Sequence, residues 1–243
     1  MSPFALKDTN TGVTVPCGKC YECRKRRVSM WSFRLMQEAK VSTTAYFVTL
    51  TYDNAHVPIT AKMFMSLCKS DLQKFFKRLR KNSEAKIRYY AVGEYGGKTW
   101  RPHYHIAMFN ATSNDIIRAW SLDNQSLGNI YFGEVSGASV GYTLKYISKC
   151  ARVPQHANDD RVREFSLMSK GLGKNYLTDA MIAYHRKDIK GRMYCTLENG
   201  RKISMPRYYK GKLYTKLERT SAGAVLLKEK MVRDEEEKQK IIS

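Results

Sequence analysis

The chain has 243 residues, of which 43% are hydrophobic and 12% aromatic, enough for a sizeable packed core. Its 43 Lys and Arg outnumber its 22 Asp and Glu, so the formal net charge is +21. This excess predicts an anionic partner, either a nucleic acid or a membrane surface. No apolar run approaches a bilayer span and no apolar signal segment opens the chain, so we expect no membrane association.

Three of the six cysteines lie within seven residues, at Cys17, Cys20 and Cys23. This uneven placement favours an intracellular, reducing setting over a disulfide scaffold. Thiolates two residues apart can converge on zinc, but a closed tetrahedral site needs a fourth ligand from elsewhere. The candidates for that ligand are Cys68, Cys150, Cys195, His56, His156 and His185. The alternative is a loop packed through reduced thiols.

An amphipathic stripe predicts a helix from Arg24 to about Lys40. Its first four residues are cationic and suit DNA phosphate, or they simply form a solvated charged turn. Residues 44–52 are predicted to form a strand and residues 70–81 a helix that opens with a capping box from Ser70 and Gln73. The buried stripe of that second helix is predicted to consist of Leu72, Phe75, Phe76 and Leu79.

The most informative stretch, residues 101–109, reads as a buried strand. Alternation along a strand places His103 and His105 on one face. The preceding strand-like run, residues 87–95, and a turn at 96–99 predict an antiparallel hairpin in which Glu94 lies beside both histidines. Two imidazoles and one carboxylate suit Mg²⁺ or Mn²⁺. The alternative is a pair of half-buried histidines with no metal.

A helix is predicted over residues 139–149, after a short helix at 114–120 and a strand at 129–135. At about 100° per residue, one side of the helix carries Tyr142, Tyr146 and Lys149, while the other carries the aliphatic residues. The tyrosines are neighbours one turn apart. Taken alone, they could equally be ordinary amphipathic tyrosines in a chain with 16 of them.

The C-terminal third differs in character. Residues 151–175 are polar and basic, residues 176–187 are predicted to be helical, and Asn199-Gly200 predicts a β-hairpin turn within 193–214. Aromatic and cationic residues mix over 207–212, which suits base stacking with phosphate contacts or an ordinary exposed hairpin. Residues 222–243 read as a terminal helix or a frayed tail.

The order of these elements predicts an α+β fold. An antiparallel sheet would carry helices on one face and present His103 and His105 on the other, open face. We expect three parts: a cysteine-containing arm with a basic helix (1–40), a core (41–150) and a basic extension with a hairpin and a helix (151–243).

Together, His-x-His on a strand, a preceding Glu, a later Tyr-x-x-x-Tyr-x-x-Lys and the strand at 46–52 resemble the HUH endonucleases, which nick single-stranded DNA. With the leading Pro-Cys-Gly-x-Cys-x-x-Cys-Arg at 16–24, the chain looks most similar to the replication initiators of gokushovirus-type microviruses. Each motif alone is loose, but four in this order are fairly specific. The resemblance covers roughly the first two thirds of the chain.

The resemblance implies an HUH/RRM-like sheet and a two-tyrosine endonuclease of rolling-circle replication. Glu94, His103 and His105 would bind Mg²⁺ or Mn²⁺, and Tyr146, with Tyr142 and Lys149, would carry the transesterification. The expected partners are single-stranded DNA, a replication origin and a host replication helicase, in the cytoplasm of a bacterial host. Two alternatives stay open: a non-enzymatic DNA-binding or packaging protein, and a plasmid relaxase or transposase of the same chemistry.

Overall fold

The structure is a computed structural model that describes residues 5–7, 14–18, 20–123, 125–137, 139–141, 144 and 153–224, with 232 and 239. These residues belong to two compact units, 1–174 and 175–243, which are described separately. The predicted three-part division of the chain stays a prediction.

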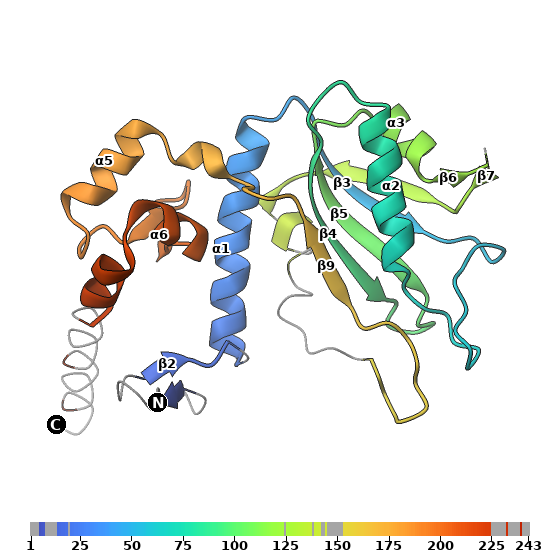
Figure 1. The fold of residues 1–243 in the computed structure, drawn as a ribbon, viewed down its shortest axis with the longest axis horizontal. Helices are drawn as coiled ribbons and strands as arrows, with labels where there is room; N and C mark the ends of the chain where they lie inside the picture. Colours follow the sequence, from blue (N-terminus) through green and yellow to red (C-terminus); the bar gives the residue numbers. More distant parts are fainter. Residues whose placement is uncertain are drawn as a thin grey trace. The chain divides into compact units, whose positions relative to one another are not determined.

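The first unit is an α+β domain built on a five-stranded antiparallel sheet of order β8-β3-β5-β4-β9, which confirms the predicted fold class (Figure 1). Its elements are β1 (Ala5–Lys7), β2 (Thr14–Pro16), α1 (Tyr21–Lys40), β3 (Ala45–Thr51), α2 (Lys69–Lys81), β4 (Arg88–Tyr95), β5 (Pro102–Phe109), α3 (Ser113–Ala119), β6 (Ser121–Leu122), β7 (Gln125–Ser126), β8 (Ile130–Glu134) and β9 (Phe165–Met168).

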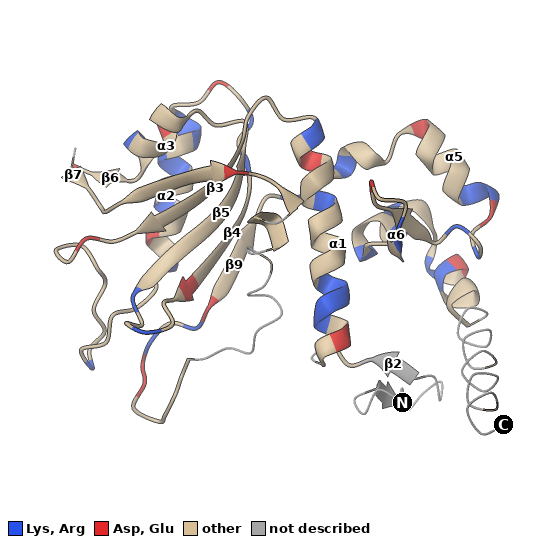
Figure 2. Cartoon of the chain, turned by 180° about the vertical axis from the view of Figure 1, so that it is seen from behind, with Lys and Arg blue, Asp and Glu red and all other residues tan. Residues whose placement is uncertain are grey.

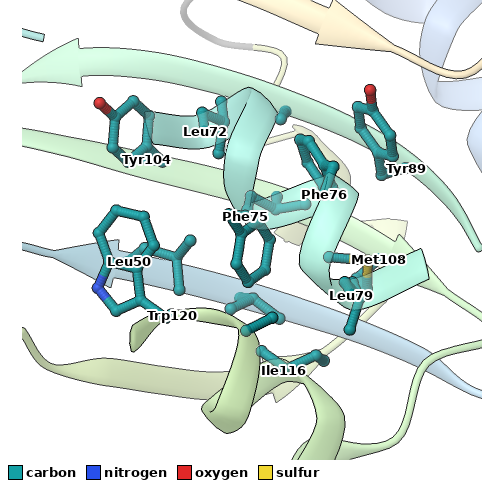
Figure 3. Close-up of a cluster of buried hydrophobic side chains, with 14 of the residues drawn as sticks. Leu50, Leu72, Phe75, Phe76, Leu79, Tyr89, Tyr104, Met108, Ile116 and Trp120 are labelled. Carbon is teal, nitrogen blue, oxygen red and sulfur yellow. The ribbon is translucent and has the colours of Figure 1, made fainter. Parts of the chain in front are cut away.

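One face of the sheet packs against α2 and α3 (Figure 3). The predicted stripe of α2 is confirmed, since Leu72, Phe75, Phe76 and Leu79 are all buried. These side chains meet the even-numbered residues of β5, including Tyr104 and Met108, as strand alternation requires. Removal of these large apolar side chains from water is the main force that fixes α2 on the sheet.

The other face is less open than we predicted, because α1 covers part of it. Leu35 of α1 is buried in a second cluster with Tyr90 of β4 and the last odd-numbered residues of β5, Ala107 and Phe109. Glu38 of α1 also accepts hydrogen bonds from Arg88 and from the Gly173 backbone. The sequence indicated the amphipathic stripe of α1 but not which face of the sheet it would cover.

The predicted capping box of α2 is wrong. The N-cap residue is Cys68, so Ser70 lies inside the first turn and makes no cap, and Cys68 itself supplies no side-chain cap bond. By contrast, Thr112 caps α3 by accepting a hydrogen bond from the Asp115 amide. Helix ends predicted from sequence were therefore displaced by a residue or two, which is the usual uncertainty of such boundaries.

β9 was missed within the polar stretch 151–175. It is four residues long and pairs with β4 at the edge of the sheet, with Val92 opposite Ser166. Residues 166 and 168 are polar and apolar on the same side, so the segment shows no clean alternation. Its strand conformation depends on the ladder with β4 rather than on its own propensity.

The second unit contains η1 (Lys174–Tyr176, at its boundary), α5 (Asp179–Lys187), β10 (Tyr194–Thr196), β11 (Lys202–Ser204) and α6 (Arg207–Leu213). The hairpin predicted from Asn199-Gly200 is confirmed, with Cys195 opposite Ile203 and Gly200 at φ 78°. The extended reading of 207–212 is wrong, because these residues form α6 and Tyr209 is fully buried. Tyr209 is therefore not a base-stacking surface. Most of the predicted C-terminal helix at 222–243 lies outside the described residues.

Candidate metal centre

Strands β4 and β5 place one carboxylate and two imidazoles together. In the antiparallel ladder Glu94 lies opposite His103, and β5 alternation returns His105 to the same face. The turn between the strands is closed by a hydrogen bond from the Gly96 amide to the Arg101 carbonyl. The predicted hairpin and its register are therefore confirmed.

The three side chains meet at one carboxylate oxygen. Nε2 of His103 and Nε2 of His105 each lie 2.9 Å from Glu94 Oε1. One ligand atom from each of the three residues lies within 4.8 Å of the other two. The group is partly sheltered, since the side chains of Glu94 and His105 are 2% and 8% exposed while that of His103 is 19% exposed. A ligand would therefore reach the centre from the His103 side.

The second ring nitrogens hold the imidazoles in place. His103 Nδ1 lies 3.1 Å from the Arg101 carbonyl oxygen, and His105 Nδ1 lies 2.9 Å from Thr49 Oγ1 of β3. Phe47, also on β3, stacks on the His105 ring at a centroid distance of 5.5 Å. Partners of this kind orient ligating histidines and fix their tautomers.

These contacts fit a cation. A carbonyl oxygen only accepts, so His103 Nδ1 carries a hydrogen and donates it to Arg101. In neutral His103 the lone pair of Nε2 would then face the carboxylate of Glu94, and a 2.9 Å contact between two acceptors requires a proton or a metal ion. In addition, the buried Glu94 Oε2 has no hydrogen-bond partner among the described residues.

Glu94 is ready to ligate at neutral pH. Burial by itself would raise the pKa of this carboxyl, but hydrogen bonding to His103 and then His105 outweighs it and holds the pKa below the usual range. The charged carboxylate and two imidazole nitrogens are a ligand set for a divalent ion that keeps open positions. Such an ion can also bind a phosphate oxygen.

The predicted tyrosine helix is described in part. Gly137, residues 139–141 and Leu144 are helical, and Val140 and Leu144 are buried in the cluster beneath α1, as the aliphatic side of the predicted helix requires. Tyr142, Tyr146 and Lys149 lie outside the described residues. Their roles therefore stay predictions from the sequence.

Two residues beside the centre were missed by sequence reasoning. Thr49 and Phe47 lie on β3, where Thr49 is directly opposite His105 in the ladder. The signal that finds them is the pairing of β3 with β5, which no local pattern in residues 44–52 specifies. The cysteines at 17, 20 and 23 are brought together elsewhere in the unit, at the start of α1.

Residues 45–151 match a family model of replication-associated proteins, described under the name ORF2. The chain belongs to this family. It is 30% identical over 216 residues to the "Replication-associated protein ORF2" of Spiroplasma virus 4, which covers 81% of this chain and 66% of that protein. It is 28% identical over 215 residues to the "Replication-associated protein VP4" of Bdellovibrio phage phiMH2K, covering 80% of this chain and 65% of that protein.

A third relative, the "Replication-associated protein ORF4" of Chlamydia phage 1, is 25% identical over 225 residues, 81% of this chain and 52% of that protein. The chain thus spans about two thirds of the length of the first two relatives and about half of the third. No solved structure matches the chain. The predicted resemblance to phage replication proteins is confirmed. Within the described part of the chain, no helix is long and apolar enough to cross a membrane.

Proposed function

We propose that this protein initiates rolling-circle replication by nicking single-stranded DNA at an origin through a tyrosine nucleophile. The observation that carries the proposal is the convergence of Glu94, His103 and His105 on one point in a chain of a replication-associated family. A structural histidine pair would need neither an unpaired buried carboxylate oxygen nor acceptors aimed at each other.

In this mechanism Glu94, His103 and His105 hold a divalent cation, Mg²⁺ or Mn²⁺. When bound, the cation supplies polarisation of the scissile phosphate and offsets charge in the transition state. The chain itself orients the ligands: the Arg101 carbonyl fixes the His103 ring and Thr49 fixes the His105 ring. The exposed edge of His103 leaves the approach for a DNA strand.

The proposed nucleophile is the phenolate oxygen of Tyr146. A tyrosine is weakly nucleophilic at its ordinary pKa of about 10, so a nearby cation such as Lys149 is needed to favour the phenolate. As the oxygen–phosphorus bond to Tyr146 forms, the bond from phosphorus to the DNA 3′ oxygen breaks, and that oxygen takes up a proton. The products are a 5′-phosphotyrosine and a free 3′-hydroxyl.

The second tyrosine, Tyr142, explains how the cycle ends. The covalent link conserves the energy of the phosphodiester bond, so the strand can later be rejoined. Rolling-circle replication needs one transesterification to start and another to terminate. While one tyrosine holds the DNA end, the other attacks the regenerated site.

The proposal places the protein in the cytoplasm of a bacterial host, with single-stranded DNA, its origin and a host replication helicase as partners. A plasmid relaxase or transposase would use the same chemistry on another substrate. The competing function is a DNA-binding or packaging protein without catalysis, which the net charge of +21 favours. Such a protein needs no Glu-His-His group, so the two classes differ in their dependence on Glu94 and the tyrosines.

A covalent-adduct assay separates them. The protein is incubated with circular single-stranded DNA that carries its own replication origin, with Mn²⁺ or Mg²⁺, and then denatured. We expect protein that migrates with DNA, and no adduct with EDTA or in the Tyr142→Phe/Tyr146→Phe variant. Tyr184→Phe, in the second unit, is the matched control and should form the adduct at the wild-type yield.

The single variants divide the roles of the two tyrosines, and Tyr146→Phe should lose most of the initial adduct. An undiminished adduct in Tyr146→Phe contradicts its role as the first nucleophile. Tight DNA binding without any adduct supports the packaging protein instead.

A further inference from the structure

A group of three cysteines lies at the start of α1 and takes no part in the centre on β4 and β5. The sulfur atoms of Cys17, Cys20 and Cys23 all lie within 4.8 Å of one another. Cys20 is the N-cap residue of α1, and Cys23 lies in its first turn. No disulfide joins any of the five cysteines in the described part of the chain.

The backbone between these cysteines is shaped around a sulfur atom. Gly18 has a φ of 74°, in the left-handed region that glycine adopts at little cost, so the chain turns back directly after Cys17. This turn brings the Cys20 amide to 3.2 Å from Cys17 Sγ, to which it donates a hydrogen bond. A negatively charged thiolate accepts such a bond better than a neutral thiol does.

The surroundings of the group are electropositive. The N-terminus of the 20-residue helix α1 carries a partial positive charge, which favours thiolates nearby. Four consecutive cations, residues 24–27, follow in the first turns of the helix, and Figure 2 shows them in blue near its start. Three thiolates this close would still repel one another unless a cation lay between them.

We propose that Cys17, Cys20 and Cys23 bind one Zn²⁺ as thiolates. Three sulfur–zinc bonds form and three thiol protons are released to solvent. At a zinc–sulfur distance of about 2.3 Å, tetrahedral geometry separates the sulfurs by about 3.8 Å, which is compatible with sulfurs that already lie within 4.8 Å of one another. An iron–sulfur cluster binds each cysteine to a different iron and holds the sulfurs farther apart.

The ion would tie the loop at 17–20 to the first turn of α1. The four cations at 24–27 would then be held in helical conformation beside a site with three negative ligands. Among the described residues no fourth His, Cys, Asp or Glu joins the group. The number of sulfur ligands is therefore the quantity to measure, and it has no bearing on the Glu94 centre, which has no sulfur.

Cobalt substitution measures it. The full chain is stripped of metal, loaded with Co²⁺ and examined for the thiolate-to-cobalt charge-transfer band in the near ultraviolet. The intensity of this band counts the thiolates, and the visible bands report tetrahedral geometry. We expect intensity for at least three thiolates, displaced by one equivalent of Zn²⁺. We expect its loss in Cys17→Ser/Cys20→Ser/Cys23→Ser and its retention in Cys68→Ser.

Cys68 is a matched control because it is a half-buried thiol at the N-cap of α2, where serine is also a good cap. A charge-transfer band that survives in the triple variant, or wild-type protein without such a band, overturns the proposal. So does protein isolated with stoichiometric iron in place of zinc.

A second measurement covers misfolding of the triple variant. Trypsin cleaves after Lys and Arg, so residues 24–27 report directly on the order of the first turns of α1. In the wild-type protein, a zinc chelator should accelerate cleavage there several-fold, and added Zn²⁺ should restore protection. Equal cleavage rates with and without zinc also overturn the proposal, whatever the result of the adduct assay.

Discussion

At the residue scale, the metal centre depends most on Glu94. One of its oxygens contacts both imidazoles and the other is buried without a partner in the described part of the chain. Glu94→Gln keeps the shape of the side chain but removes the charge, and an amide oxygen is a weaker ligand for Mg²⁺ or Mn²⁺. We expect the affinity for Mn²⁺ to fall by roughly 10–100-fold or more, as measured by isothermal titration calorimetry.

Glu134→Gln is the control for this experiment. Glu134 is an exposed carboxylate on β8 of the same sheet, so the substitution makes the same change in net charge away from the histidines. Its Mn²⁺ affinity should match that of the wild type. Wild-type affinity in Glu94→Gln would mean that the histidine pair binds metal without Glu94, or that the metal binds elsewhere.

At the scale of elements, the ladder across β8, β3 and β5 places an exposed aromatic ring near the metal centre. Thr49 of β3 lies opposite both His105 and Tyr131 of β8, so all three side chains share one face. Two strand spacings separate Tyr131 from His105, about 10 Å. Tyr131 is 59% exposed. A DNA strand that crosses the sheet to reach His103 can therefore stack a base on this ring.

We expect Tyr131→Ala to weaken the binding of single-stranded DNA by about 1–3 kcal/mol, roughly 5- to 150-fold, because one base loses its stacking partner. Fluorescence anisotropy with a short labelled oligonucleotide measures this loss, and Tyr131→Phe should restore binding because it keeps the ring. Phe132→Ala is the matched control, since its side chain packs against Tyr46 on the other face. A similar loss in both alanine variants would indicate damage to the edge strand instead.

The sequence predicted those parts of the fold that local alternation specifies. The faces of β5 and the register of Glu94 against His103 followed from period-two patterning and a turn. The cover of α1 over the far end of the metal face did not, because an amphipathic helix shows that it has a buried side but not what it covers. The extended reading of residues 207–212 failed for a related reason: aromatic residues such as Tyr209 favour strands locally, and packing overrides that preference.

At the scale of the whole molecule, the charge of +21 determines how DNA binding responds to salt. Each phosphate neutralised by Lys or Arg releases a counterion, so the logarithm of the binding constant falls with that of salt concentration, by about 0.7 per contact on single strands. With about six contacts, affinity should fall a few hundredfold between 50 and 200 mM salt. Glu94→Gln should keep this slope in EDTA, because the cations that meet phosphate lie elsewhere. Tyr131→Ala should also keep the slope while it lowers affinity at every salt concentration, since stacking releases no ions. A flat salt dependence in the wild type would show that the excess charge does not face the DNA.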